Sequence, residues 1–333
     1  MARRFPAMLL VALALSLLVA PLAADAQPAG RIARIGVLWP DTPTEIYPGV
    51  DARQLFSQTL QTLGWVEGRN IALEPRFAAG DFDRLPGLAA ELVRLPVDLI
   101  VAVGSPSTRA AQHATSTIPI VMVTGSDPVQ AGFVASLARP GGNITGVTNV
   151  QTDLISKRLE LLKEAVPGVS HMGVLAPPGG TTTAAMVREA ERAARALGVQ
   201  LHIAEVADPS AFEPALAAIT TARADALLTL STTRLDAHHR QIVDLVARRQ
   251  LPAIYHAGWY VAAGGLMSYA RNRAEEFQRT AAYVDKILKG AKPADLPVEQ
   301  PTQFEFVINL KTAEALGLTI PPHILFQANE ILR

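Results

Sequence analysis

The sequence contains no cysteine, which excludes disulfides, thiolate metal sites and a cysteine nucleophile. It also excludes the modified cysteine that anchors exported lipoproteins to a membrane. Neither charge is in excess: 30 basic residues balance 30 acidic ones, so the composition does not indicate a nucleic-acid-binding surface. Aromatic residues make up only 5% of the chain while hydrophobic residues make up 49%, which is typical of an α/β core built from Ala, Leu, Val and Ile.

The first residues have the pattern of an export signal. Arg3 and Arg4 supply its positive charge, residues 7–20 are almost wholly apolar, and residues 24–26 (ADA) give a small-x-small cleavage site. An apolar run of this length is too short to span a hydrocarbon layer of about 30 Å. We therefore expect residues 1–26 to be a cleaved signal peptide and the mature protein to be periplasmic, without a lipid anchor.

Apolar runs of strand length alternate with helical patterns along the rest of the chain. Residues 35–38, 99–103 and 118–123 are continuous apolar runs, which predict a parallel sheet covered on both faces. Between them, apolar residues recur at helical spacing, as in residues 55–63 before Gly64. This alternation predicts an α/β fold.

The second half of the chain repeats the landmarks of the first half in the same order. The matching pairs are RIGVLWP (34–40) with HMGVLAP (171–177), Leu63-Gly64 with Leu197-Gly198, Asp98 before a strand ending at Ser105 with Asp225 before one ending at Ser231, and Ile118-Pro119 with Leu251-Pro252. A shared order of this kind predicts two similar doubly wound, Rossmann-like lobes with parallel sheets.

The last part of the chain is too short for a third lobe. Its strand patterns (265–269 and 304–310) and helix patterns (275–288 and 312–316) are interpreted as finishing elements for both lobes, which implies three crossings. We expect an N-lobe of residues 31–147 plus about 270–298, and a C-lobe of residues 148–269 plus about 299–333. Ligands of parallel sheets bind beyond the carboxyl ends of the strands, so a ligand cleft is expected between the lobes, with closure by a hinge.

The chain resembles the ABC transporter substrate-binding family whose characterised relatives bind tryptophan and tyrosine. The stretches that carry the resemblance are LGWVEGRNIA (63–72), FAAGDFDRLPGLAAELVR (77–94), DLIVAVGSPSTR (98–109), DPVQAGFVASLARPGGNITGV (127–147), KRLELLKEA (157–165), GGLMSYA (264–270) and the long segment 281–321. The resemblance implies a type I periplasmic-binding fold, capture of a small-molecule solute, and transient docking on an inner-membrane ABC permease. It implies neither a cofactor nor catalysis.

Hydroxyl side chains follow one strand in each predicted lobe. Ser105, Ser107 and Thr108 lie between a buried strand and a helical stretch, where hydroxyls and free backbone N–H groups suit a carboxylate. The alternative is a plain Ser/Thr helix cap. Ser231 and Thr232 occupy the matching place in the second half, which favours ligand binding at both.

Three further polar residues are candidates in the first half. Asp127 ends the next strand, where its carboxylate would pair with a ligand ammonium group; its alternative role is to cap a helix that begins at Pro128. Thr148 and Asn149 follow the glycine-rich segment 141–146, which is interpreted as the first hinge. The family resemblance makes this neighbourhood ligand-facing, whereas glycine alone indicates only chain flexibility.

Aromatic residues complete the set of candidates. Trp39, Tyr255 and Tyr269 each lie at a predicted strand end, where a ring would stack on a planar ligand, and His256 lies beside Tyr255. Packing in the core or rim is an equal alternative for each of them. The expected ligand is an aromatic or other amino acid.

No motif of a known enzyme class is present. The seven histidines form no H-E-x-x-H pattern, and neither G-x-S-x-G nor a phosphate-binding glycine motif occurs. We expect a monomeric binding protein that is not an enzyme, with no metal and no nucleic-acid partner. The alternatives are a periplasmic protein that presents its ligand to a sensor system and, less favoured, a two-lobed α/β enzyme.

Overall fold

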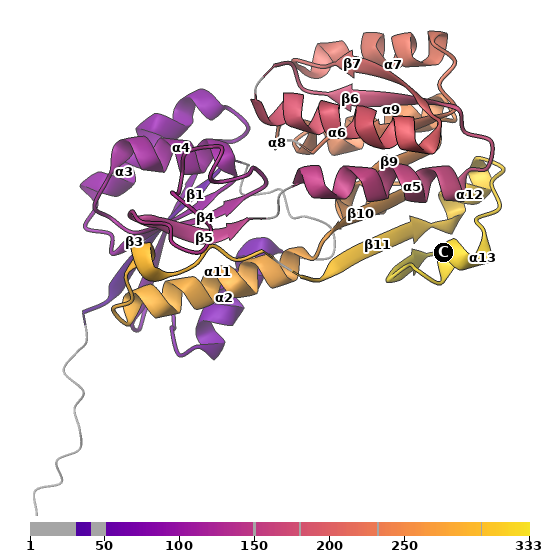
Figure 1. Ribbon diagram of the computed structural model, residues 1–333. Helices are drawn as coiled ribbons and strands as arrows, with labels where there is room; N and C mark the ends of the chain where they lie inside the picture. Colours follow the sequence, from indigo (N-terminus) through magenta and orange to yellow (C-terminus); the bar gives the residue numbers. More distant parts are fainter. Residues whose placement is uncertain (1–30, 41–50, 149–150, 180, 232, 301) are drawn as a thin grey trace, which may run out of the picture. The chain divides into compact units, whose positions relative to one another are not determined.

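A computed structural model describes residues 31–40, 51–148, 151–179, 181–231, 233–300 and 302–333. The elements from Ala33 to Arg333 pack as one unit. Within the described residues their strands form two separate sheets, each flanked by helices (Figure 1). The predicted two-lobed α/β architecture is therefore confirmed. We use N-lobe for the first sheet with its helices and C-lobe for the second.

The N-lobe sheet is parallel throughout, with the strand order β2-β1-β3-β4-β5 in the described chain. Its strands are β1 (Ala33–Trp39), β2 (Ile71–Phe77), β3 (Leu99–Val103), β4 (Ile120–Thr124) and β5 (Ile144–Thr148). Every residue of β3, β4 and β5 is buried because helices cover both faces of the sheet.

Two pairs of helices pack in the N-lobe. On one side α3 (Leu85–Arg94) contacts α4 (Ser105–Ala114); on the other α2 (Ala52–Thr62) contacts α11 (Arg273–Leu288), which comes from late in the chain (Figure 1). The Trp65 indole N–H donates to the Asp285 carboxylate at 2.8 Å and ties the end of α2 to α11.

The C-lobe sheet has the strand order β12-β11-β10-β9-β8-β6-β7 in the described chain, and β11 runs antiparallel to β10. Its strands are β6 (His171–Ala176), β7 (Gln200–Glu205), β8 (Ala226–Thr229), β9 (Ala253–Tyr255), β10 (Met267–Arg271), β11 (Phe304–Asn309) and β12 (Glu330–Leu332). The antiparallel pair arises because the chain reaches β11 only after passing through α11 of the N-lobe.

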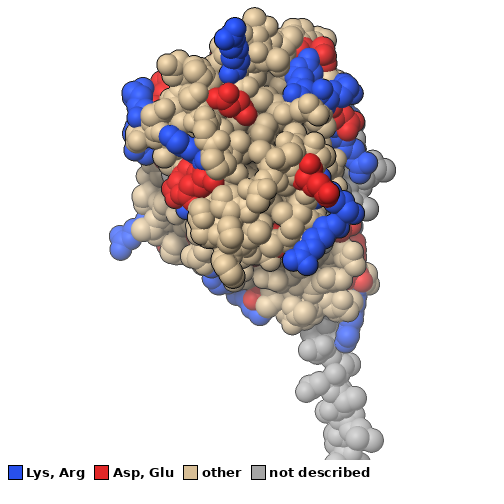
Figure 2. Space-filling view, turned by 90° about the vertical axis from the view of Figure 1, so that its right-hand side faces the viewer, with Lys and Arg blue, Asp and Glu red and all other residues tan. Residues whose placement is uncertain are grey.

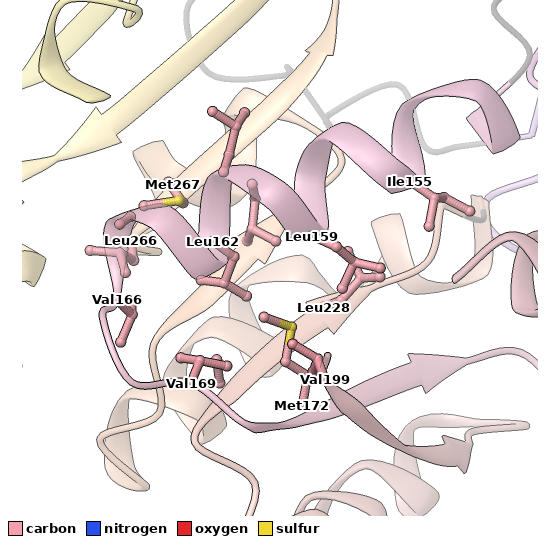
Figure 3. Close-up of a cluster of buried hydrophobic side chains, with 14 of the residues drawn as sticks. Ile155, Leu159, Leu162, Val166, Val169, Met172, Val199, Leu228, Leu266 and Met267 are labelled. Carbon is pink, nitrogen blue, oxygen red and sulfur yellow. The ribbon is translucent and has the colours of Figure 1, made fainter. Parts of the chain in front are cut away.

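Helices cover the C-lobe sheet as well. The longer ones are α5 (Ile155–Ala165), α6 (Thr181–Leu197), α7 (Phe212–Thr221) and α9 (His239–Arg248), and the shorter ones are α8 (Thr233–Asp236), α10 (Gly258–Ala262), α12 (Leu310–Ala315) and α13 (Pro322–Leu325). Single 3-10 turns are η1 (Phe82–Arg84), η2 (Gln151–Leu154), η3 (Pro209–Ala211) and η4 (Pro293–Asp295). Figure 3 shows how Ile155, Leu159 and Leu162 of α5 pack over Met172 and Leu228 of the sheet.

The two lobes are built on the same plan. Strands β1 to β5 correspond in order to β6 to β10. Gly64 and Gly198 each follow a helix, and both glycines have positive φ. Asp98 accepts a hydrogen bond from the backbone N–H of Arg34, and Asp225 accepts one from that of His171. Each carboxylate therefore holds the start of the neighbouring strand, and the repeated landmarks mark real structural equivalence.

The chain passes between the two sheets after β5, after β10 and before β11. The passage before β11 is bonded to each of the other two: Thr148 donates its N–H to the Glu299 carbonyl, and Asn272 donates its N–H to the Gln303 carbonyl. The predicted lobe boundaries near residues 147, 270 and 298 stay a prediction.

The interpretation of segment 141–146 as a hinge is wrong. Residues from Ile144 onward form β5, which is paired along its length with β4. Gly146 is required there for close packing: it has φ +135°, and a Cβ atom at this position would lie 2.2 Å from the Met122 carbonyl oxygen. The glycine therefore serves strand pairing rather than flexibility.

Among the described residues, no helix combines the length and apolar character needed to cross a bilayer. Figure 2 shows the face on the right-hand side of Figure 1, where Lys and Arg side chains alternate with Asp and Glu and no area of one sign dominates. This face agrees with the balanced charge of the sequence.

Candidate ligand-binding site

The carboxyl edge of the N-lobe sheet carries a cluster of hydroxyl groups. Helix α4 begins at Ser105, directly after β3, and its N-cap is Gly104 at φ +83°. The Ser105 Oγ lies 2.6 Å from the Thr124 Oγ1 and also bonds the Ser126 Oγ. Thr148, at the end of β5, donates its hydroxyl to the Ser126 carbonyl at 2.9 Å. We call Ser105, Thr124, Ser126 and Thr148 the hydroxyl cluster.

Two more predicted residues lie in the first turn of α4. Ser107 is fully buried, and its Oγ has no hydrogen-bond partner among the described residues. A buried hydroxyl in this state costs about 1–3 kcal/mol, so an additional acceptor or donor at this place is favourable. Thr108 is also fully buried, but its hydroxyl donates to the Gly104 carbonyl at 3.0 Å.

Asp127 takes part in a local turn. Its Oδ1 accepts hydrogen bonds from the backbone N–H groups of Val129 at 2.9 Å and Gln130 at 3.2 Å. The alternative role predicted for Asp127, the capping of a helix that begins at Pro128, is wrong because the described structure has a turn there. Asp127 does accept backbone N–H groups as a cap would, but the segment that it caps is a turn and not a helix. Binding of an ammonium group by Asp127 stays a prediction.

The carboxyl edge of the C-lobe sheet carries ionisable groups instead. Asp236 ends the short helix α8 after β8, and His256 directly follows β9. The His256 Nε2 lies 2.6 Å from the Asp236 Oδ1, and the Tyr260 hydroxyl donates to the same oxygen at 3.3 Å. The His256 Nδ1 faces the Thr229 Oγ1 at 3.5 Å. We call Asp236, His256 and Tyr260 the acid–imidazole cluster.

Thr229, His256 and Asp236 are arranged as hydroxyl, imidazole and carboxylate, as in a catalytic triad. Their geometry instead favours a role for His256 in positioning the Asp236 side chain. Thr229 is fully buried and His256 is 3% exposed. A distance of 3.5 Å between Thr229 and the imidazole is a weak contact. The short contact on the other side of the ring fixes the orientation of His256 and, through it, the side chain of Asp236.

A buried arginine lies close to this cluster. Arg158 of α5 is fully buried, and its Nε donates to the Tyr269 carbonyl at 2.7 Å. Burial lowers the pKa of the Arg158 guanidinium to about 9, against the attraction of Tyr269 and Asp236. The group is therefore charged at neutral pH. Sequence reasoning did not single out Arg158, because an arginine within an amphipathic helix has no distinguishing pattern.

The three predicted aromatic residues occupy different environments. Trp39 is 6% exposed and stacks on Phe277 of α11 at 5.8 Å between ring centroids. Tyr255 is 1% exposed and stacks on Tyr260 at 4.8 Å, and burial raises the pKa of its hydroxyl. Tyr269 is half-buried. Tyr269 lies in the middle of β10 rather than at a strand end, so that expectation is wrong, and it packs against the C-lobe core. The packing role therefore exists for all three residues, and ligand contact stays a prediction for all three.

The remaining predicted residues are Ser231, Asn149 and Thr232. Ser231 is half-buried between β8 and α8. Asn149 and Thr232 lie outside the described residues. The structure therefore brings Ser105 and Thr148 together in one cluster and places Ser231 near the other. The sequence analysis missed four residues of the two clusters, namely Thr124, Ser126, Asp236 and Tyr260. A search for polar residues after every strand, with Ser126 and His256 as starting points, would have found part of this set.

The family model for ABC transporter substrate binding proteins matches residues 47–332. The chain belongs to this family. The family is a class of substrate-binding proteins rather than of enzymes. Because the match includes residues 105–260, the hydroxyl cluster and the acid–imidazole cluster both lie within the part of the chain that the family model matches.

Individual relatives agree with this assignment. The chain is 28% identical over 274 residues to the Tyrosine-binding protein of Clostridioides difficile strain R20291, covering 82% of this chain and 78% of the relative. It resembles a conserved domain protein from Vibrio cholerae with a TM-score of 0.83 and 28% identity, covering 90% of this chain and 100% of that one. A domain from Streptococcus pneumonia in complex with L-Trp gives a TM-score of 0.80 and 26% identity, covering 90% and 99%. The type I periplasmic-binding fold is thereby confirmed.

Proposed function

We propose that this protein is the periplasmic substrate-binding component of an ABC importer and that it captures an aromatic amino acid. Family membership supports the transport context. The tyrosine-binding relative and the L-Trp complex support the ligand class. The protein binds its ligand without catalysis and delivers it to an inner-membrane permease by transient docking, as a monomer.

The observation that carries the proposal is the hydroxyl cluster at the start of α4. The first N–H groups of a helix have no partner within the helix and carry the positive end of its dipole. Gly104 has no side chain to cap them, and Ser105 adds a hydroxyl that is itself held by Thr124 and Ser126. The buried Oγ of Ser107 adds a hydroxyl without a partner among the described residues. Together these groups suit the carboxylate of an amino acid.

The ligand's ring is assigned to the three predicted aromatic residues, of which Trp39 and Tyr255 end strands and Tyr269 lies in the middle of β10. Tyr269 is the best placed of the predicted three because its ring is only half-buried, and it stacks on Phe304 at 5.7 Å, which leaves an aromatic surface of two rings. Closure of the lobes over the ligand removes water from both edges and strengthens every polar contact made there.

A thermal-shift screen of the mature protein tests the ligand class. Ligand that binds only the native state stabilises it by RT ln(1 + [L]/Kd), about 2.7 kcal/mol at a hundred times Kd. We expect L-tryptophan, L-tyrosine or L-phenylalanine to raise the melting temperature by several degrees, whereas purines and simple aromatic acids raise it less. If no amino acid shifts the transition, the ligand assignment is wrong and the fold stands.

A transport assay separates import from sensing. Deletion of the gene in its own host should slow uptake of the radiolabelled amino acid that binds, because a substrate-binding protein is the entry point of its importer. Normal uptake, combined with loss of a transcriptional response to that amino acid, would instead favour the ligand-presenting alternative. A permease and an ATPase encoded beside the gene would support import.

A further inference from the structure

An amino acid carries an ammonium group as well as a carboxylate, and the hydroxyl cluster suits only the second. The predicted partner of the ammonium group is Asp127, whose Oδ1 accepts two backbone N–H groups of its own turn and whose Oδ2 accepts none within the described chain. A second carboxylate, Asp236, lies at the carboxyl edge of the other sheet, after β8. Strands β8 and β9 are the counterparts of β3 and β4, so Asp236 occupies the place in the C-lobe that corresponds to the hydroxyl cluster in the N-lobe.

The hydrogen bonds of Asp236 leave one of its oxygens available. Within the described chain, His256 and Tyr260 both donate to Oδ1, and neither reaches Oδ2. The side chain is 13% exposed, while the His256 side chain behind it is 2% exposed. The Asp236 carboxylate is thus held in place through Oδ1, while its partly exposed side remains accessible to a ligand.

The groups around Asp236 attract its carboxylate or donate to it. The buried, charged guanidinium of Arg158 attracts it, and both His256 and Tyr260 present donors to it. A carboxylate shielded from water interacts with a cation more strongly than an exposed one does. His239, on α9, packs on the Tyr260 ring at 5.7 Å and Tyr255 stacks on it at 4.8 Å, so the donor hydroxyl of Tyr260 is held in place.

We propose that Asp236 binds the ammonium group of the amino-acid ligand, and that His256 and Tyr260 are positioning residues that orient its carboxylate. This inference rests on the proposed function and adds to it the residue that distinguishes an amino acid from a plain carboxylic acid. The N-lobe supplies neutral donors for one end of a zwitterion, and the C-lobe supplies the anion for the other end.

Isothermal titration of the mature protein with L-tryptophan and indole-3-propionate tests this assignment. The second compound has the same ring and carboxylate but no ammonium group. We expect the wild-type protein to prefer L-tryptophan, and Asp236→Asn to weaken L-tryptophan about 100-fold, since loss of one partner of a shielded charge pair has effects of this order. Binding of indole-3-propionate should change less than about threefold, because its contacts do not include Asp236.

Three further variants make the test specific. Tyr260→Phe removes one hydrogen bond to Oδ1 and should weaken L-tryptophan about fivefold without weakening indole-3-propionate, which a general loss of structure would not do. Asp244→Asn removes an acidic group from the exposed side of α9 in the same lobe and should change neither affinity. Asp127→Asn examines the competing site. Circular dichroism and melting temperatures establish that each variant is folded.

The outcomes separate the inference from the proposed function. If the wild-type protein binds L-tryptophan and Asp236→Asn keeps the same preference for it over indole-3-propionate, Asp236 is not the partner and the inference is wrong. Loss of the preference in Asp127→Asn alone would give the role to Asp127. If the wild-type protein binds none of the aromatic amino acids, the proposed function fails at its ligand, and the inference fails with it.

Discussion

The two sheets share a strand order but present different chemistry at their carboxyl edges. After β3 and β4 the N-lobe presents neutral hydroxyls, those of Ser105, Thr124 and Ser126, which bond to one another. After β8 and β9 the C-lobe presents Asp236 and His256, with the charged Arg158 close by. The same backbone plan thus supports an edge of neutral hydroxyls in one lobe, where the Asp127 carboxylate is bound by its own turn, and an ionic edge in the other.

The difference shows how duplicated lobes come to serve one asymmetric ligand. The strands that carry the two edges are equivalent, so side-chain identity alone decides which group each edge binds. Hydroxyls and helix N–H groups are donors that suit an anion, whereas a carboxylate suits a cation. Two different edges bind the two ends of a zwitterion in a single orientation. Two identical edges would not distinguish its carboxylate from its ammonium group.

The strongest test of this contrast is the removal of the buried charge at the C-lobe edge. Arg158→Ala should lower the free energy of unfolding by about 3–5 kcal/mol, because it leaves Asp236 without its buried counter-charge and the Tyr269 carbonyl without a donor. Arg158→Met should cost less, since it keeps the packing of the aliphatic stem. Urea denaturation followed by circular dichroism measures both.

The matched change in the N-lobe is Thr124→Val, which removes a buried hydroxyl without removing a charge. We expect a loss of about 1 kcal/mol, the value of an ordinary hydrogen bond. Equal losses for Thr124→Val and Arg158→Ala would contradict the distinction between a neutral and an ionic edge.

An intermediate effect is expected from a pair of equivalent glycines in the first strand of each sheet. A Cβ atom at Gly173 in β6 would lie 2.4 Å from Ile219 Cγ2, whereas one at Gly36 in β1 would lie 3.1 Å from Leu92 Cδ2. Gly173→Ala should therefore cost about 1–3 kcal/mol through overpacking. Gly36→Ala should stay within about 1 kcal/mol of zero, because small shifts of Leu92 relieve the contact and alanine restricts the unfolded chain. A larger loss for Gly36→Ala would show that the C-lobe is not the more tightly packed of the two at this position.

Much of the fold follows from the sequence because its signals are local and repeated. Continuous apolar runs predicted β3 and β4, and the paired aspartates Asp98 and Asp225 marked equivalent strand starts. The hinge at 141–146 was misplaced because a glycine in a strand and a glycine in a flexible link look alike in sequence. Only the neighbouring backbone of Met122 explains why Gly146 cannot carry a side chain.

The candidate site was harder to predict because its residues are far apart in the chain. Ser105 was predicted from its place after a strand and Thr148 from its place after the glycine-rich segment 141–146, and the structure joins them through Ser126. Asp236 and His256 are twenty residues apart on different elements, so no spacing links them. Asp127 has the stronger sequence signal, yet the N–H groups of its own turn occupy one carboxylate oxygen, a local competition that the sequence alone does not show.

The smallest expected effect concerns the aspartates at the opposite, amino edges of the sheets. The backbone N–H of Ser170, with further bonds from His171 and the Ser170 hydroxyl, holds the pKa of Asp225 below its usual range. A depressed pKa in the folded state contributes stability above the unfolded value near 4, and this contribution is lost as pH falls through the folded value.

The Asp225 side chain is 42% exposed, so screening by water limits the contribution to less than about 1 kcal/mol. We therefore expect Asp225→Asn to destabilise the protein slightly at pH 7 and the difference from wild type to shrink as pH falls below the unfolded value near 4, measured by urea denaturation across pH. Asp98→Asn, the equivalent change directly before β3, should also destabilise the protein at pH 7, because Asp98 accepts a hydrogen bond from the Arg34 N–H at the start of β1 at 2.8 Å. A difference between Asp225→Asn and wild type that grew on acidification would show that the carboxylate is not held in its ionised form, and the equivalence of the two strand starts would then not extend to their chemistry.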